Sequence, residues 1–158
     1  MVTILFHSTI FGPIHSRRLG TSLGVNLSPN DGKICSFDCV YCEAGFNSQG
    51  VGTTGFPGRN HVREQLENKL AQMKADGMPL DVITFSGNGE PTLHPEFEHI
   101  IADTIAVRDH YFPQAKVSVL CNSTRLHLPQ VVRALESVDN CILKLDSAVT
   151  ATMRLIDQ

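Results

Sequence analysis

Three of the five cysteines in this 158-residue chain fall within eight residues, and this cluster limits what the chain can fold into more than any other stretch. It runs Cys35-Ser-Phe-Asp-Cys39-Val-Tyr-Cys42, a C-x3-C-x2-C spacing. Thiolates this close together are typical ligands of zinc and of iron–sulfur clusters. Structural zinc sites and electron-carrying iron–sulfur clusters normally have four protein ligands. The remaining cysteines, Cys121 and Cys141, lie far downstream in apolar runs, so the motif leaves one metal position for a substrate or cofactor.

Two other interpretations of the cysteines stay open. A histidine from elsewhere in the chain could complete a zinc site. His94 precedes Pro95 at the start of an expected helix, where a capping role is favoured, and the other six histidines are scattered without metal-ligand spacing. A disulfide with one free thiol is the second alternative. Nothing in the sequence indicates an oxidising compartment, and clustered cysteines in an intracellular chain indicate metal binding or catalysis.

The eight-residue motif resembles the signature of the radical S-adenosylmethionine (radical SAM) enzymes. Tyr41 stands before the last cysteine, where that family has an aromatic residue. The resemblance implies that Cys35, Cys39 and Cys42 hold a [4Fe-4S] cluster, and that S-adenosylmethionine binds the fourth iron. It also implies that the reduced cluster cleaves S-adenosylmethionine to methionine and a 5′-deoxyadenosyl radical, which takes hydrogen from a substrate. A reductant of the flavodoxin or ferredoxin type is the implied partner.

Composition describes one ordinary globular domain. Hydrophobic residues make up 42% and charged residues 18% of the chain, and no apolar run reaches the roughly 18 residues of a membrane span. The apolar start lacks the basic segment of a signal peptide, so we expect a first strand at residues 1–7, a cytoplasmic protein and no membrane partner. The net charge of −3 gives little attraction to nucleic acid, so charge does not support a nucleic-acid substrate.

Hydrophobic patterns predict strands that alternate with helices. The strands are expected at 22–28, 80–86, 116–121 and 141–145, and the helices at 60–77, 94–112 and 129–138. Such βα units form a parallel sheet with right-handed crossovers. The expected fold class is therefore α/β, an incomplete TIM-type barrel of about four βα units. The glycine-rich stretch 44–58 is expected to be a long mobile loop, of the kind that often forms a lid.

Polar residues follow the carboxyl end of each expected strand, and these ends meet at the rim where such folds have their active sites. After the second strand come Gly87, Asn88, Gly89 and Glu90. A tight turn would explain them, but the glycines would also allow close approach to a ligand, and Glu90 offers a carboxylate to a cation. The stretch resembles the radical SAM segment that binds the methionine ammonium, with Asn88 in place of a glycine.

Candidates at the later strand ends are Asn122 and Ser123, followed by Lys144 and Asp146. The resemblance implies that Asn122, Ser123 and Asp146 bind the ribose or the substrate, and ordinary turn polarity is the alternative.

The pair Arg17-Arg18 suits an anion or a carboxylate, although a solvated surface pair is the usual interpretation. Its segment, residues 11–27, resembles the entry segment of a group of short radical SAM proteins, some of which act in tRNA wyosine-base synthesis.

The sequence thus predicts that residues 1–158 form a radical SAM core domain, truncated at its C-terminal side because the family's partial barrel usually has six βα units. A non-enzymatic iron–sulfur or zinc-binding module, such as an electron carrier, is the alternative. The residues do not identify the substrate. An outer strand near Leu145 should expose unpaired backbone groups. We expect residues 147–158 to fold back over this edge, helped by Met153, Leu155 and Ile156, or the protein to form a homo-oligomer through it.

Overall fold

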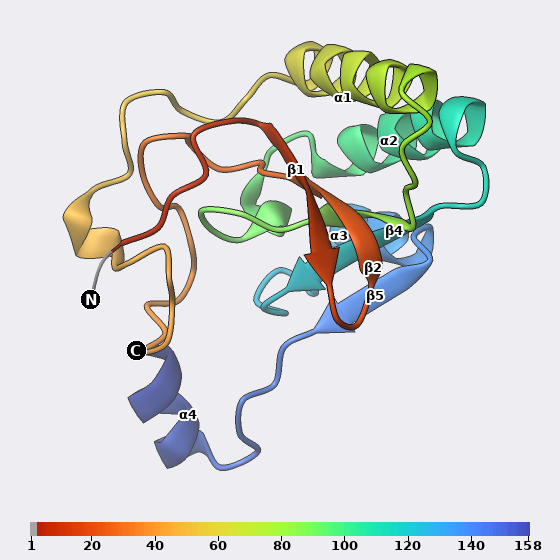
Figure 1. The fold of residues 1–158 in the computed structure, drawn as a ribbon. Helices are drawn as coiled ribbons and strands as arrows, with labels where there is room; N and C mark the ends of the chain where they lie inside the picture. The colour runs from red at the N-terminus through yellow and green to blue at the C-terminus, as the bar shows by residue number, and fades with distance from the viewer. Residues whose placement is uncertain (1–2) are drawn as a thin grey trace.

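The computed structural model describes residues 3–158, which form one five-stranded sheet of order β1-β2-β3-β4-β5 (Figure 1). The strands are β1 Ile10–Ser16, β2 Gly20–Val25, β3 Val82–Phe85, β4 Lys116–Cys121 and β5 Asn140–Leu143. Strand β1 pairs with β2 in antiparallel fashion, and each later neighbour pairs in parallel. The sheet stays open. The expected α/β class with four parallel strands is confirmed.

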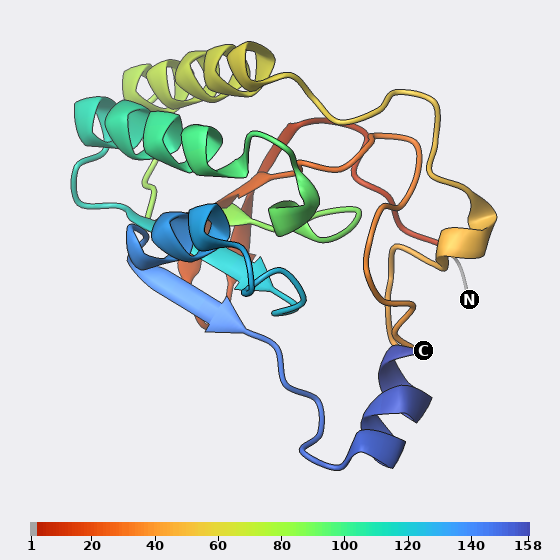
Figure 2. The same ribbon diagram turned by 180° about the vertical axis from the view of Figure 1, so that it is seen from behind.

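Three helices lie on one side of this sheet (Figures 1 and 2). They are α1 Arg59–Ala75, α2 Phe97–Tyr111 and α3 Pro129–Glu136. A last helix, α4 Thr150–Asp157, stands apart from them beside the cysteine loop, and two 3-10 turns span Asn47–Gln49 and Pro91–Leu93. Each crossover between parallel strands therefore covers the same face. In the part of the chain that the structure describes, no helix has the length and hydropathy of a membrane span.

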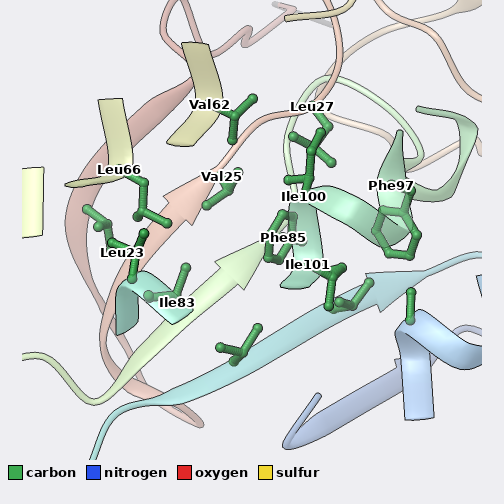
Figure 3. Close-up of a cluster of buried hydrophobic side chains, with 14 of the residues drawn as sticks. Leu23, Val25, Leu27, Val62, Leu66, Ile83, Phe85, Phe97, Ile100 and Ile101 are labelled. Carbon is green, nitrogen blue, oxygen red and sulfur yellow. The ribbon is translucent and has the colours of Figure 1, made fainter. Parts of the chain in front are cut away.

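The core lies between the sheet and helices α1 and α2 (Figure 3). Alternate residues of β2 and the segment after it, Leu23, Val25 and Leu27, are buried on one face, as period-2 alternation requires. All four residues of β3 are buried, which marks it as the central strand. Helix α1 contributes the predicted stripe of buried residues Val62, Leu66, Leu70 and Met73. The core therefore fixes the strand ends that carry the polar residues.

The expected strand at residues 1–7 is wrong for residues 3–7, which have no regular structure, and residues 1–2 lie outside the described part of the chain. The backbone groups of Phe6 bond to the side chain of Asn88 instead of to a strand. The Phe6 ring stacks on Phe11, with 3.8 Å between centroids. The first strand is β1, and the expected turn at Gly12-Pro13 lies inside it as a register shift. Phe6 thus packs by stacking on Phe11 of β1 and does not pair as part of a strand.

Helix α4 does not cover the sheet edge, contrary to expectation. Its last carbonyls accept hydrogen bonds from the cysteine loop, Asp157 from Asp38 N–H and Ile156 from Val40 N–H, both at 2.9 Å. Helix C-termini leave carbonyls without intrahelical partners, which explains why the loop amides attract them. Leu155, expected on the covering face, is 73% exposed. On β5, Leu143 is left 47% exposed.

The open edge predicts self-association. Strand β5 has a neighbour on one side only, so its outer N–H and C=O groups and exposed apolar side chains can pair with another chain. We expect the sedimentation-derived mass to rise with protein concentration, and Leu143→Lys to suppress this rise. Leu155→Lys, at an exposed position on α4, is the matched control. A monomer at every concentration, or equal suppression by both variants, would contradict the prediction.

Candidate functional site

The three clustered cysteines line one cavity of about 370 Å³ at the carboxyl ends of the parallel strands. They reach it from the loop that follows β2, while the other walls come from the ends of β3, β4 and β5. The lining residues include Phe37, Tyr41, Gly87, Gly89, Glu90, Leu120, Asn122, Ile142 and Lys144. Side chains separated by about a hundred positions in the sequence therefore meet at the rim that the alternating pattern predicted.

Two of the three sulfurs have a nitrogen donor beside them. The Asn122 side-chain amide lies 3.6 Å from Cys35 Sγ, and the Lys144 ammonium lies 3.3 Å from Cys39 Sγ. Burial raises the pKa of both thiols, although Lys33 and Lys144 act in the opposite direction. Metal ligation needs thiolates, so a metal would have to displace these protons.

A buried lysine, Lys33, holds the cysteine loop by hydrogen bonds from the protein interior. The side chain of Lys33 is 2% exposed, and its ammonium donates to Asp38 Oδ1 at 2.9 Å and to the Gly45 carbonyl at 2.8 Å. Asp38 also accepts from Asn47 N–H at 2.7 Å. The Asn47 side chain in turn bonds to both backbone groups of Cys35. Sequence reasoning missed this network.

A second lysine joins β5 and α4 to the cysteines. The Lys144 ammonium contacts Asp157 and lies 2.7 Å from Asp146 Oδ2 and 4.8 Å from the centre of the Phe37 ring. Burial lowers the pKa of Lys144, but its bonds to the two aspartates outweigh burial and raise it. Tyr41 donates its hydroxyl to Asp146 at 2.6 Å. Burial, followed by this bond, raises the pKa of Tyr41 to about 12.

The loop Gly87 to Glu90 is joined by its backbone to the segment that enters the cysteine motif. Ile34 and Gly89 form a parallel bridge, with Ile34 N–H donating to the Asn88 carbonyl and Glu90 N–H to the Ile34 carbonyl. A Cβ on Gly89 would collide with that same Ile34 carbonyl, and a Cβ on Gly87 would collide with Asn26. Packing alone therefore requires both glycines, and the two loops are placed as one unit.

Glu90 is buried and already holds two strand ends together. Its Oε1 accepts from the amide and the hydroxyl of Thr92, and its Oε2 accepts from Asn122 N–H at 2.7 Å. An ionised carboxylate offers about four acceptor positions. Three are used here, so Glu90 keeps acceptor capacity at the cavity wall.

A family model for the radical SAM superfamily matches residues 30–148, a span that contains the three cysteines and every other residue of this site except Asp157. This chain belongs to the radical SAM superfamily. The [4Fe-4S] cluster and S-adenosylmethionine expected from the motif are the cofactors of that superfamily.

Similar chains occur in distant microbes. A UPF0026 protein of Helicobacter pylori is 31% identical over 149 residues, covering 94% of this chain and 46% of that protein. A UPF0026 protein of Methanocaldococcus jannaschii is 30% identical, with coverages of 94% and 43%. A protein of Brachyspira hyodysenteriae named GTPase Obg is 32% identical over 94% of this chain but only 20% of its own length. The chain thus spans less than half of these relatives.

Among solved structures, BtrN in complex with AdoMet and 2-DOIA is similar, with a TM-score of 0.51 and 18% identity. The likeness covers 84% of this chain and 49% of BtrN. At this identity the likeness shows the fold, an open sheet of the radical SAM partial-barrel type. The relation to tRNA wyosine-base synthesis stays a prediction.

The structure places the expected radical SAM contacts in two groups. Tyr41, Gly87, Gly89, Glu90 and Asn122 line the cavity with the cysteines. Asn88, Ser123 and Asp146 bond to protein groups instead.

In the second group, Asn88 is completely buried and its amide donates to the carbonyls of Phe6 and Pro29, each at 2.8 Å. Ser123 donates its hydroxyl to the Lys144 carbonyl, and Asp146 takes the contacts from Tyr41 and Lys144. The geometry thus gives these three residues a role in holding the rim together.

The pair Arg17-Arg18 lies in the turn between β1 and β2. This turn precedes the amino end of β2, whereas the cysteine loop follows the carboxyl end. The two arginines are therefore at the opposite end of the sheet from the cavity, and the geometry supports their interpretation as a surface pair.

The glycine-rich loop 44–58 is tethered, contrary to the expectation of a mobile lid. Asp31 accepts hydrogen bonds from the amides and hydroxyls of Thr53 and Thr54, between 2.6 and 3.2 Å, and these bonds hold its pKa well below the usual range. His94 Nε2 lies 2.8 Å from the Pro57 carbonyl. Burial lowers the pKa of His94, so the neutral ring donates this bond. Of the described residues, those lining the cavity come from outside this loop.

Removing the Asp31 carboxylate should release this loop. In Asp31→Ala the four bonds from Thr53 and Thr54 are lost, so we expect hydrogen exchange at residues 50–58 to accelerate severalfold while the sheet amides keep their protection. Hydrogen–deuterium exchange read by mass spectrometry measures both. Glu64→Ala, at an exposed position of α1, is the control. Unchanged exchange at residues 50–58 would show that Asp31 does not hold the loop.

Proposed function

We propose that this chain is the core of a radical SAM enzyme, that Cys35, Cys39 and Cys42 hold a [4Fe-4S] cluster, and that S-adenosylmethionine binds beside it. The proposal is carried by one observation: the three cysteines and the Gly87 to Glu90 loop line the same 370 Å³ cavity. Three thiols fit a cluster with one open iron, and a buried carboxylate with spare acceptor capacity fits the ammonium of S-adenosylmethionine. When bound, the two cofactors supply an electron-driven cleavage of the carbon–sulfur bond that yields a 5′-deoxyadenosyl radical for hydrogen abstraction.

The residues of this chain would then bind and orient the cofactors. Glu90 accepts the ammonium, held in place by Thr92 and Asn122. Asn122 and Lys144 donate toward the sulfurs of Cys35 and Cys39, an interaction that adjusts the potential of an iron–sulfur site. Leu120 and Ile142 form an apolar wall. That wall is about 40% exposed, at 41% and 42%, so bound substrate or another chain must complete the exclusion of water.

We propose residues 1–158 as the core domain, and a flavodoxin- or ferredoxin-type protein as the source of electrons. The substrate is unassigned, and the net charge of −3 lends no support to nucleic acid. A non-enzymatic iron–sulfur or zinc-binding module is the second candidate. The buried carboxylate of Glu90 at the cavity wall favours the enzyme, because an electron carrier has no cationic ligand for it to bind.

The cluster assignment predicts that three cysteines, and not five, hold iron. Anaerobic reconstitution should give about four irons per chain, and alanine at Cys35, Cys39 or Cys42 should abolish this iron and the visible absorption. Alanine at Cys121 or Cys141, which are outside the motif, is the matched control and should leave the cluster intact. Zinc that stays bound through iron reconstitution would support the zinc module and refute the cluster.

The Glu90 assignment predicts weaker binding of S-adenosylmethionine without loss of the cluster. Glu90→Gln keeps the size but removes the charge, and it turns one acceptor that faces the Thr92 or Asn122 N–H into a donor. The loss of one charged hydrogen bond to the ligand corresponds to about 1.5–3 kcal/mol, roughly 10- to 150-fold in Kd. Titration followed by the change in the cluster's paramagnetic resonance spectrum measures it. Thr92→Val is the control, because it removes only the hydroxyl that donates to Oε1. Equal Kd values for Glu90→Gln and the parent chain would refute the assignment of Glu90 as the acceptor of the ammonium group.

A further inference from the structure

Lys33 is a charged group in the interior for which the proposed chemistry has no direct use. It is the largest fully buried side chain of the described chain, whereas lysine is almost never fully buried unless it is paired. Its partners are Asp38 and the Gly45 carbonyl. Breaking a buried pair leaves an uncompensated charge, so the position requires a cation with these acceptors around it.

The two bonds of Lys33 reach one residue within the cysteine motif and one residue just beyond it. Asp38 lies between the first and second cysteines, and Gly45 lies three residues beyond the last. Asp38 also accepts a hydrogen bond from Asn47 N–H, and the Asn47 side chain donates to the Cys35 carbonyl. The Lys33 ammonium therefore links two parts of the cysteine loop to each other through protein contacts alone. The three cysteines are held together before any metal enters.

The charge of Lys33 also lies within the cysteine loop. Its ammonium bonds to Asp38, the residue before Cys39, and to the carbonyl of Gly45, three residues after Cys42. Asp38 is 25% exposed and Lys33 only 2%, so water screens the carboxylate more than the ammonium. Among the described residues, Lys33 is not one of those lining the cavity, so it acts on the site through the cysteine loop.

We propose that Lys33 is a positioning residue: it pre-forms the cysteine loop for the metal and places a positive charge within that loop. This inference rests on the cluster proposed above. A cation near an iron–sulfur site stabilises the reduced, more negative state, so Lys33 raises the reduction potential. Lys144 and Asn122 act on the sulfurs from inside the cavity, while Lys33 acts from the protein side.

Three substitutions separate the positioning role from the charge. Lys33→Met keeps length but loses both bonds and the charge, and Lys33→Arg keeps the charge. Asp38→Asn weakens the loop contacts and leaves the Lys33 charge in place. Lys116→Met, at an exposed position of β4, is the matched control. The readouts are hydrogen exchange at residues 36–47 of the metal-free protein, the rate of iron loss to a chelator, and the midpoint potential of the reconstituted protein.

We expect faster exchange at residues 36–47 and iron loss roughly 10- to 100-fold faster in Lys33→Met, the range for partners that orient metal ligands. Its midpoint potential should shift to more negative values, and Lys33→Arg should restore most of it. Asp38→Asn should loosen the loop without that negative shift. A parent chain that takes up no iron would defeat the proposed function.

A parent chain that holds the cluster, with Lys33→Met unchanged in exchange, iron loss and potential, would instead overturn only the role of Lys33. If Lys33→Met does not fold, Asp38→Asn decides the positioning role, because unchanged exchange and iron loss in that variant would overturn it.

Discussion

The close approach of two backbones, Ile34 and Gly89, is the constraint on which the site depends. One parallel bridge joins the segment that enters the cysteine motif to the loop that follows β3. The two segments approach closely only because residue 89 is a glycine. A Cβ at position 89 would collide with the Ile34 carbonyl. Glu90 then extends the connection to the end of β4 through Asn122. Thiols and carboxylate therefore share one cavity because the backbone leaves no other arrangement.

Charged side chains also help to hold the cysteine loop in place. Two lysines flank the cysteine loop, Lys33 from within the protein and Lys144 from the end of β5, and each is compensated by aspartates. Both ammonium groups lie where burial alone would favour a neutral amine. Burial makes the thiols of Cys35 and Cys39 costly to ionise. Cations fixed on two sides of the loop lower the cost of forming thiolates. The loop is therefore suited to binding a metal complex that carries negative charge.

Much of this architecture could be predicted from the sequence, and the failures share one physical cause. Periodicity gave the parallel strands, because a helix with a periodic apolar face lies between each parallel strand and the next along the chain. The convergence of the cysteines with Gly89 and Glu90 followed from strand direction alone. Asn88 could not be assigned, since its partners Phe6 and Pro29 come from distant segments. The sequence assigned no role to Lys33, because local sequence does not reveal burial. Loop 44–58 looked mobile for the same reason, as its tether is Asp31.

The open sheet edge and the open cavity are two aspects of one strand. In β5 the side chain of Ile142 lines the cavity, and the next residue, Leu143, points to the opposite face, as alternation in a strand requires. The backbone between them carries the unpaired outer groups. A strand that paired with this edge would satisfy those groups, and its alternate residues would extend the wall formed by Leu120 and Ile142. Pairing at this edge would therefore also cover part of the cavity. A neighbour for β5 would help a bound substrate to exclude water from the site.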